Sequence, residues 1–81
     1  MASDLRGAVG RRVRELRRGI GISQEELAAR AGLHRNYIGS VERGERDVGI
    51  NAIARLVRAL GTSLSDFFAP FRDRRENKRL R

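Results

Sequence analysis

Apolar residues recur along this 81-residue chain at the spacing of α-helices, and this spacing limits the possible folds more than any other feature. In the first segment, from about Ser3 or Asp4 to Arg18, the steps between apolar positions are four, four, three and four residues. These positions are Leu5, Val9, Val13, Leu16 and Ile20. Such steps place an apolar stripe along one face of a helix, and arginines fill the other face. No stretch alternates apolar and polar residues as a strand does, so the pattern predicts an all-α fold.

Glycines and a single proline divide the rest of the chain into further helical segments. We expect four of them, at Gln24–Ala31, Arg35–Arg43, about Ile50–Leu60 and roughly Ser63–Phe68. The letters "SQEE" form a capping box, in which the Ser23 hydroxyl accepts from the Glu26 amide and the Glu26 side chain reaches back. Helices of eight or nine residues are marginal alone and must pack together. The expected inward positions are Leu27, Ala28, Ala31, Leu33, Ile38, Val41, Ile50, Ile53, Leu56, Val57 and Leu60.

The charge is strongly positive and unevenly distributed. Eighteen Lys and Arg against ten Asp and Glu give a net charge of +8. Residues 1–22 carry a net +4, residues 23–71 carry none, and residues 72–81 carry another +4. Such a balance favours a polyanionic partner, with nucleic acid ahead of a membrane. We therefore expect one domain over residues 1–71, followed by a basic tail at 72–81 that we expect to be disordered.

Several functional classes lack their usual sequence signals. The chain has no cysteine, a single histidine and no glycine-rich phosphate loop, so we expect no enzymatic activity, metal, cofactor or small-molecule ligand. No apolar run approaches the roughly 18 residues of a membrane span, and arginines interrupt the N-terminal segment where a secretory signal would be apolar. We expect a cytoplasmic, nucleoid-associated protein.

Several short motifs occur together in a recognisable order. They are "GISQEELAARAGL", "YIGSVERG" and "RALG", with Arg17 directly after Leu16. Over about residues 9–68 the chain resembles the Cro/phage-repressor (XRE) helix-turn-helix family. The segment "GLHRNYIGSVERGERDV" is most similar to the controller proteins of restriction–modification systems. The resemblance implies a five-helix lambda-repressor-like domain that binds double-stranded DNA as a homodimer. It also implies an inverted-repeat operator and a buried ion pair between Arg17 and Glu42.

The third helix carries the candidates for reading bases. If Ile38 and Val41 point inward, then Arg35, Asn36, Gly39 and Ser40 lie on the opposite side of the helix. Arginine can donate two hydrogen bonds to guanine, and asparagine can form a matching pair with adenine. The candidate base-contacting residues are Arg35, Asn36, Tyr37, Ser40 and Arg46. The alternatives are a solvated helix start for Arg35 and Asn36, a packing ring for Tyr37 and no contact for Ser40.

Other candidates surround this helix. The expected phosphate contacts are Gln24, His34 and Arg43, by resemblance and because a helix N-terminus favours anions. For His34, simple positioning at the helix entry is an equal alternative. The expected dimer interface is the exposed apolar side of the fourth and fifth helices, although some of its members could belong to the core. These candidates are Ile50, Leu64, Phe67, Phe68 and Phe71.

The predicted function is a dimeric, sequence-specific regulator of transcription that could control a restriction–modification operon. One alternative is an antitoxin-like regulator, or another partner-binding regulator, whose main role is protein interaction. Weaker alternatives are an enzyme and a tail that binds membrane surfaces.

Overall fold

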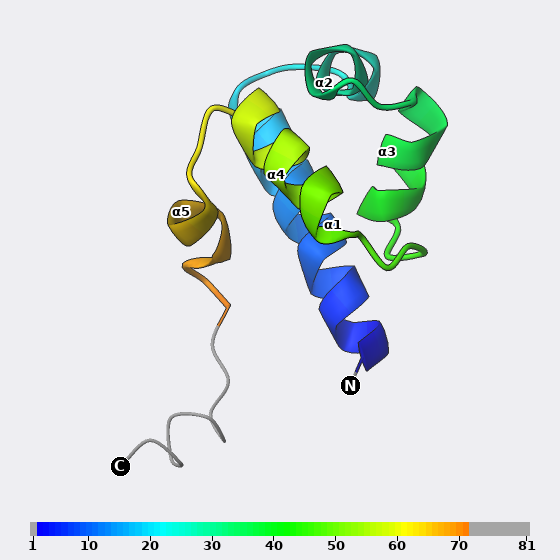
Figure 1. The fold of residues 1–81 in the computed structure, drawn as a ribbon, viewed down its shortest axis with the longest axis vertical. Helices are drawn as coiled ribbons and strands as arrows, with labels where there is room; N and C mark the ends of the chain where they lie inside the picture. The colour runs from blue at the N-terminus through cyan, green and yellow to red at the C-terminus, as the bar shows by residue number, and fades with distance from the viewer. Residues whose placement is uncertain (1, 72–81) are drawn as a thin grey trace.

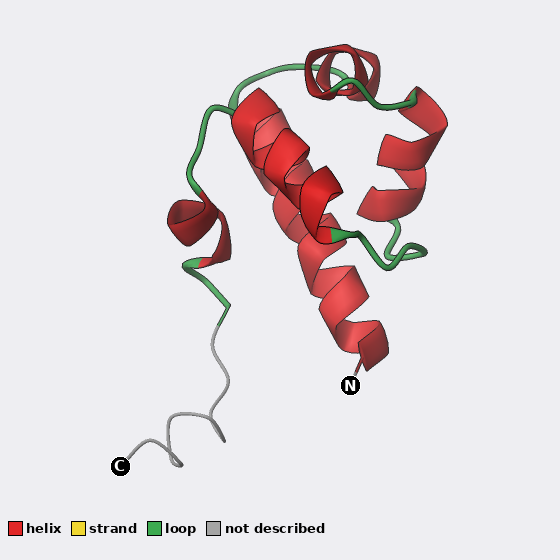
Figure 2. Cartoon of the chain, in the orientation of Figure 1, coloured by secondary structure: helices red, strands yellow, loops and turns green. Residues whose placement is uncertain are grey.

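The computed structural model describes residues 2–71, and the predicted basic tail at 72–81 lies outside this range. Regular structure within the described residues is entirely helical (Figure 1, Figure 2). The helices are α1 (Ala2–Gly19), α2 (Gln24–Ala31), α3 (Arg35–Glu42), α4 (Ile50–Ala59) and α5 (Leu64–Phe68). The all-α, five-helix prediction is therefore confirmed, with helix ends within about two residues of those expected.

A single core joins all five helices. Its buried apolar side chains are Val9, Val13, Leu27, Ala28, Ala31, Ile38, Val41, Leu56, Val57, Leu60 and Phe67. In Figure 1, α3 and α5 lie to either side of α1. The core covers only the middle of α1, because Leu5 is 57% exposed near its start and Ile20 is also exposed just past its end. The apolar stripe of this helix is therefore longer than the part of it that the core covers.

The apolar stripe of α4 is also narrower than predicted. Ile50 is the first residue of α4 and is 82% exposed, so the prediction that it faces the core is wrong. Ile53 is half-buried, and Leu56 and Val57 are buried. The first turn of α4 therefore presents its apolar side chain to solvent.

Two glycines allow α1 to pass very close to the end of α3. A Cβ atom on Gly10 would lie 2.3 Å from the carbonyl oxygen of Val41 and 2.8 Å from that of Glu42. Gly44 follows α3 in a left-handed conformation with φ of +76°, which strongly favours glycine. A Cβ on Gly44 would meet the backbone of Gly7 at 3.0 Å. The crossing of α1 and α3 thus depends on the absence of side chains on both partners.

Arg12 attaches the short helix α5 to α1. Its guanidinium donates to the carbonyl oxygens of Asp66 and Phe67, both at 2.7 Å, and to the Glu15 carboxylate at 2.9 Å. A cation at the C-terminal end of a helix satisfies carbonyl groups that have no partner within the helix. Arg12, one of the arginines on the face opposite the apolar stripe, is therefore a structural residue.

Candidate nucleic-acid interface

The turn between α2 and α3 is ordered by backbone hydrogen bonds. The Ser23 hydroxyl accepts from the Glu26 amide at 3.0 Å and starts α2 as predicted, whereas the Glu26 carboxylate pairs with Arg30 at 3.2 Å. The amides of Gly32 and Leu33 then donate to carbonyl groups in the last turn of α2. These contacts fix the direction in which α3 leaves α2.

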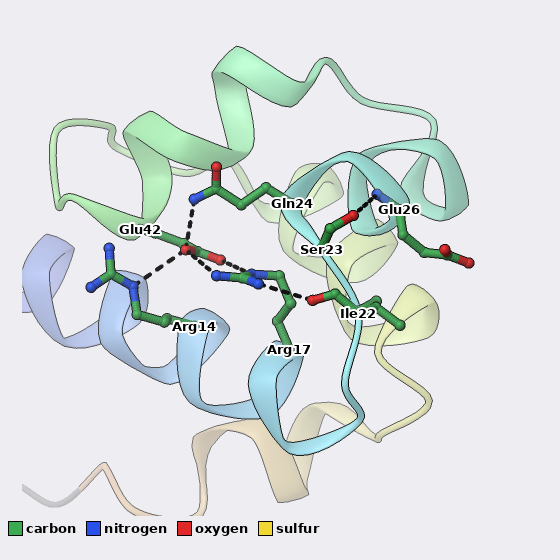
Figure 3. A network of polar contacts seen from close by, with 7 residues as sticks. All are labelled: Arg14, Arg17, Ile22, Ser23, Gln24, Glu26 and Glu42. Atoms are coloured by element: carbon green, nitrogen blue, oxygen red, sulfur yellow. Dashed lines mark hydrogen bonds and ion pairs between the residues drawn. The ribbon is translucent and has the colours of Figure 1, made fainter.

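The carboxylate of Glu42 connects α1, α2 and α3 (Figure 3). It accepts from Arg17 Nε at 2.6 Å and Nη2 at 3.1 Å, from Gln24 Nε2 at 3.0 Å and from Arg14 Nε at 3.4 Å. Arg17 also donates to the carbonyl oxygen of Ile22 at 2.9 Å. The Glu42 side chain has no solvent exposure. The ion pair implied by the resemblance is therefore present, and it is part of a larger network.

The network holds Glu42 in its charged form. Burial alone would raise the pKa of Glu42, but hydrogen bonds from Arg17, Gln24 and Arg14 together with the Arg17 charge lower it below its ordinary value. The pKa of Arg17 is raised, chiefly by its hydrogen bonds to Glu42. Both groups therefore remain ionised at neutral pH, where each stabilises the other.

The first turn of α3 is open to solvent. His34 precedes the helix as its N-cap residue but makes no side-chain capping bond, and Arg35 and Asn36 follow as exposed residues. Arg35 has only a long contact to Glu25, with 4.0 Å between Nε and Oε2. The structure thus places Arg35 and Asn36 side by side and accessible, as predicted.

Ser40 does not share that surface. It is 7% exposed, and its hydroxyl donates to the carbonyl oxygen of Tyr37 at 2.9 Å while accepting from Arg46 Nε at 3.1 Å. The prediction that Ser40 lies on the exposed side of the helix with Arg35 is wrong, and this burial does not favour its predicted contact with a base. Gly39 is buried too, because the side chains of Gln24 and Arg43 cover it.

Tyr37 and Arg46 form one unit. The Tyr37 ring is half-buried against the core, and the guanidinium carbon of Arg46 lies 5.4 Å from the ring centroid. This distance is typical of a cation–π contact. The Tyr37 ring therefore packs partly against the core, and the exposed Arg46 lies over it.

The candidate phosphate-contacting residues surround α3. Gln24 is half-buried and uses one of its two amide protons on Glu42. Arg43 pairs with Glu45 at 3.0 Å, and the hydrogen bond from Arg43 lowers the pKa of Glu45. His34 is exposed at the start of α3. All three remain candidates, and Arg43 would have to leave Glu45 to contact an anion.

The candidate dimer residues divide into two groups. Ile50 and Leu64 are exposed at 82% and 52%, and Phe68 and Phe71 are half-buried. Phe67 is only 1% exposed and stacks among the other two phenylalanine rings, so its assignment to the interface is corrected to the core. A groove of about 250 Å³ lies between α1, the loop after α3, α4 and α5. Its lining residues are Leu5, Arg6, Val9, Arg46, Asp47, Val48, Ile53 and Phe68.

Within residues 2–71, no cluster of three His, Asp or Glu side chains could hold a metal ion. Among the described helices, none has the length and apolarity needed to cross a membrane.

Comparisons with known proteins agree on the class of this fold. The helix-turn-helix family model (HTH_3) matches residues 13–67. The control protein C.SmaI of Serratia marcescens is 46% identical over 61 residues, covering 75% of this chain and 73% of C.SmaI. The crystal structure of the restriction-modification controller protein C.AhdI from Aeromonas hydrophila gives a TM-score of 0.75 at 44% identity, covering 78% of this chain and 96% of C.AhdI. The crystal structure of the restriction-modification controller protein C.Esp1396I, as a tetramer in complex with its natural 35 base-pair operator, gives a TM-score of 0.78 at 30% identity. This match covers 82% of this chain and 87% of the C.Esp1396I chain.

Proposed function

This chain belongs to the helix-turn-helix family of DNA-binding transcriptional regulators, and we propose that it acts as a homodimer that reads an inverted-repeat operator through α3. The observation that carries the proposal is the open first turn of α3, where Arg35 and Asn36 are exposed on a rigid support. In this motif the N-terminal residues of the second helix reach base edges in the major groove. Guanine and adenine are the bases that these two side chains recognise best.

Phosphate contacts would fix the position of α3 in the groove. Gln24 and His34 lie at the N-terminal ends of α2 and α3, where unpaired backbone amides attract anions. Arg43 lies directly after α3. We assign these three residues to the DNA backbone and Arg35, Asn36, Tyr37 and Arg46 to the bases. Contacts to phosphate position a protein, whereas contacts to base edges select the sequence.

Two copies of the chain are needed to read an inverted repeat. The exposed Ile50 and Leu64 and the half-buried Phe68 and Phe71 supply an apolar surface for the second copy. A two-fold axis through this surface would place two α3 helices on half-sites about one helical turn, roughly 34–36 Å, apart.

The relatives support a proposal about the regulated genes. C.SmaI is a control protein, C.AhdI is a restriction–modification controller protein, and C.Esp1396I, another such controller, forms a tetramer on its operator. We propose that this chain likewise controls a restriction–modification operon and has no enzymatic activity. Its switch would be its own concentration, through dimerisation and cooperative occupancy of adjacent sites. Its place of action would be the cytoplasm, at the nucleoid.

The tail at residues 72–81 would have an accessory role. It carries a net charge of +4 with a single apolar residue, Leu80. We assign it to non-specific attraction toward DNA, because charged termini act mainly through long-range electrostatics. Its removal should lower affinity for random DNA more than the preference for the operator.

The decisive experiment is selection of bound sequences from a random duplex pool, followed by salt titration on the enriched sequence. We expect a palindromic consensus and a steep fall in affinity with salt, set by about 6–10 phosphate contacts per dimer. An Arg35→Ala, Asn36→Ala double variant should lose the consensus, whereas Arg11→Ala, on an exposed position of α1, should keep it. A pool that shows no enrichment would refute the proposal.

A further inference from the structure

Ser40 is buried in the second half of α3, and its hydroxyl both donates and accepts a hydrogen bond. A hydroxyl has one proton to donate, and the carbonyl oxygen of Tyr37 can only accept, so that proton goes to Tyr37. The Nε of Arg46 can only donate, so the Ser40 oxygen must accept from it. The direction of both hydrogen bonds is therefore fixed by chemistry. Bonds arranged in such a chain polarise and strengthen one another.

The loop after α3 brings Arg46 back over the helix. The amide of Gly44 donates to the Val41 carbonyl at 3.0 Å, and the amide of Glu45 donates to the Ser40 carbonyl, also at 3.0 Å. The left-handed conformation of Gly44 lets the chain reverse at this point. Ser40 therefore anchors the loop through its backbone carbonyl and anchors the Arg46 side chain through its hydroxyl.

Two contacts hold the Arg46 guanidinium, and within residues 2–71 its terminal nitrogens remain free. Its Nε bonds to Ser40, and its guanidinium lies over the Tyr37 ring. Among the described residues, its two terminal nitrogens have no hydrogen-bond partner. Arg46 itself is exposed. The contacts thus fix the orientation of the guanidinium plane and leave its two terminal nitrogens available to a hydrogen-bond acceptor.

We propose that Ser40 is a positioning residue for DNA recognition, which holds Arg46 against Tyr37 so that its terminal nitrogens are already ordered before DNA binds. This inference rests on the proposed function, in which Arg46 contacts a base. An arginine that is free in solution loses much rotamer freedom when it is fixed on a base. With Ser40 present, this loss of rotamer freedom has already occurred when the protein folds, so it no longer weakens DNA binding. Ser40 therefore influences sequence preference without touching DNA.

The test is a double-mutant cycle on the operator obtained by selection. The variants are Ser40→Ala and Arg46→Ala, alone and combined, with Ser40→Thr as the matched control that keeps the hydroxyl. The Glu45–Ser40 bond joins backbone atoms only, so Ser40→Ala removes the two hydrogen bonds of the hydroxyl, to the Tyr37 carbonyl and from Arg46, and leaves the loop anchor in place. Affinity is measured for the operator and for a scrambled duplex, and thermal unfolding is recorded for each variant.

We expect Ser40→Ala to weaken operator binding by roughly threefold to tenfold per protomer, the effect of ordering one long side chain. Ser40→Thr should bind nearly as the wild type does. In the Arg46→Ala background, Ser40→Ala should cause no further loss. Binding to the scrambled duplex should change little in either background. An equal loss with and without Arg46, or no loss at all, would overturn the proposal.

A second measurement does not depend on DNA. The Nε–H signal of Arg46 in a nitrogen-15 NMR spectrum should be protected from exchange in the wild type and in Ser40→Thr. In Ser40→Ala it should exchange rapidly. An unchanged signal in Ser40→Ala would also overturn the proposal. If the wild type showed no sequence preference, the proposed function would fail, while this spectrum would still report separately whether Ser40 holds Arg46.

Discussion

The α2–α3 half of the protein and the α4–α5 half present different surfaces. The apolar side chains of α2 and α3 are buried apart from the half-buried Tyr37 and the exposed Ala29, and the other exposed positions of these helices are mostly polar or charged. In the other half, Leu56, Val57 and Phe67 are buried, but Ile50 and Leu64 remain exposed. The first half is therefore complete within one protomer, whereas the second has apolar surface left for a partner.

The interactions that stabilise the two halves also differ. A carboxylate with four donor bonds joins α2 and α3 to α1, whereas packed phenylalanine rings and the Arg12 bonds hold α5. Directional hydrogen bonds fix side-chain geometry, which is what sequence reading requires. Apolar contacts are less directional and suit an interface between two copies. Five predictions test this division, beginning with the largest expected effect.

Removal of the Glu42 carboxylate should cause the largest effect. Glu42→Ala leaves Arg17 buried without its partner, and such a change costs on the order of 3–5 kcal/mol of stability. Urea unfolding followed by circular dichroism measures it. Glu26→Ala, which removes an exposed carboxylate from α2, should cost about 1 kcal/mol at most. Equal losses in the two variants would mean that the polar network does not hold this half together.

The same carboxylate predicts how stability depends on pH. The pKa of Glu42 is lower in the folded protein than in the unfolded chain, where it is about 4.3. Its contribution is therefore fully present above that value and is lost as the pH falls through the lower folded-state pKa. Unfolding free energies measured between pH 7 and pH 3 should show this fall, and Glu42→Gln should flatten it.

A charge placed on the α4–α5 surface should break the dimer. Ile50→Asp replaces an exposed apolar side chain at the start of α4, where an acidic residue suits the helix N-terminus. The monomer should stay folded, while dimerisation should weaken by about 2–4 kcal/mol if Ile50 is central to the interface. Sedimentation at several concentrations measures this. Asn51→Asp adds the same charge at the next exposed position and should leave the dimer nearly intact.

Truncation of Arg35 should change sequence preference without affecting the fold. Arg35→Ala should cost about 1–3 kcal/mol on the preferred operator and relax the preference at one base pair. Binding to a set of single-base variants of the operator measures both effects. Arg11→Ala, which removes the same charge from α1, should weaken all sequences alike. A uniform loss for Arg35→Ala would remove its base-reading role.

The Arg43–Glu45 pair should give the smallest effect. Both groups are exposed, and the hydrogen bond from Arg43 lowers the pKa of Glu45, so Glu45 is ionised at neutral pH. Glu45→Gln should raise affinity slightly at low salt, because Arg43 is released and a charge that repels phosphate is removed. The gain should fade as salt rises, because mobile ions screen exposed charges. Glu15→Gln on α1 is the control, and a gain that survives high salt would contradict the electrostatic explanation.

The helices could be predicted from the sequence because their signals are local. The Ser23 cap and the glycines at positions 32 and 44 act within a few residues of the ends that they set. The exposure of Arg35 and Asn36 followed from helical periodicity in the same way. These predictions required no knowledge of which elements pack together.

The errors concern contacts between distant parts of the chain. Ser40 was placed outward because Ile38 and Val41 fill one face of α3, but the returning loop covers the opposite face with Arg46. Arg12 bonds to carbonyl groups 54 and 55 residues away, and no local pattern indicates this. Phe67 and Ile50 were both apolar candidates for the interface, and only packing could show that one is buried and the other exposed.

The absence of a side chain at Gly10 has a consequence for redesign of this protein. Because α1 lies against the backbone carbonyl groups of Val41 and Glu42, any side chain at position 10 would displace the final turn of α3. The opening turn, with Arg35 and Asn36, has no such constraint. A new operator preference is therefore best engineered by substituting the first few positions of α3 while Gly10 is kept.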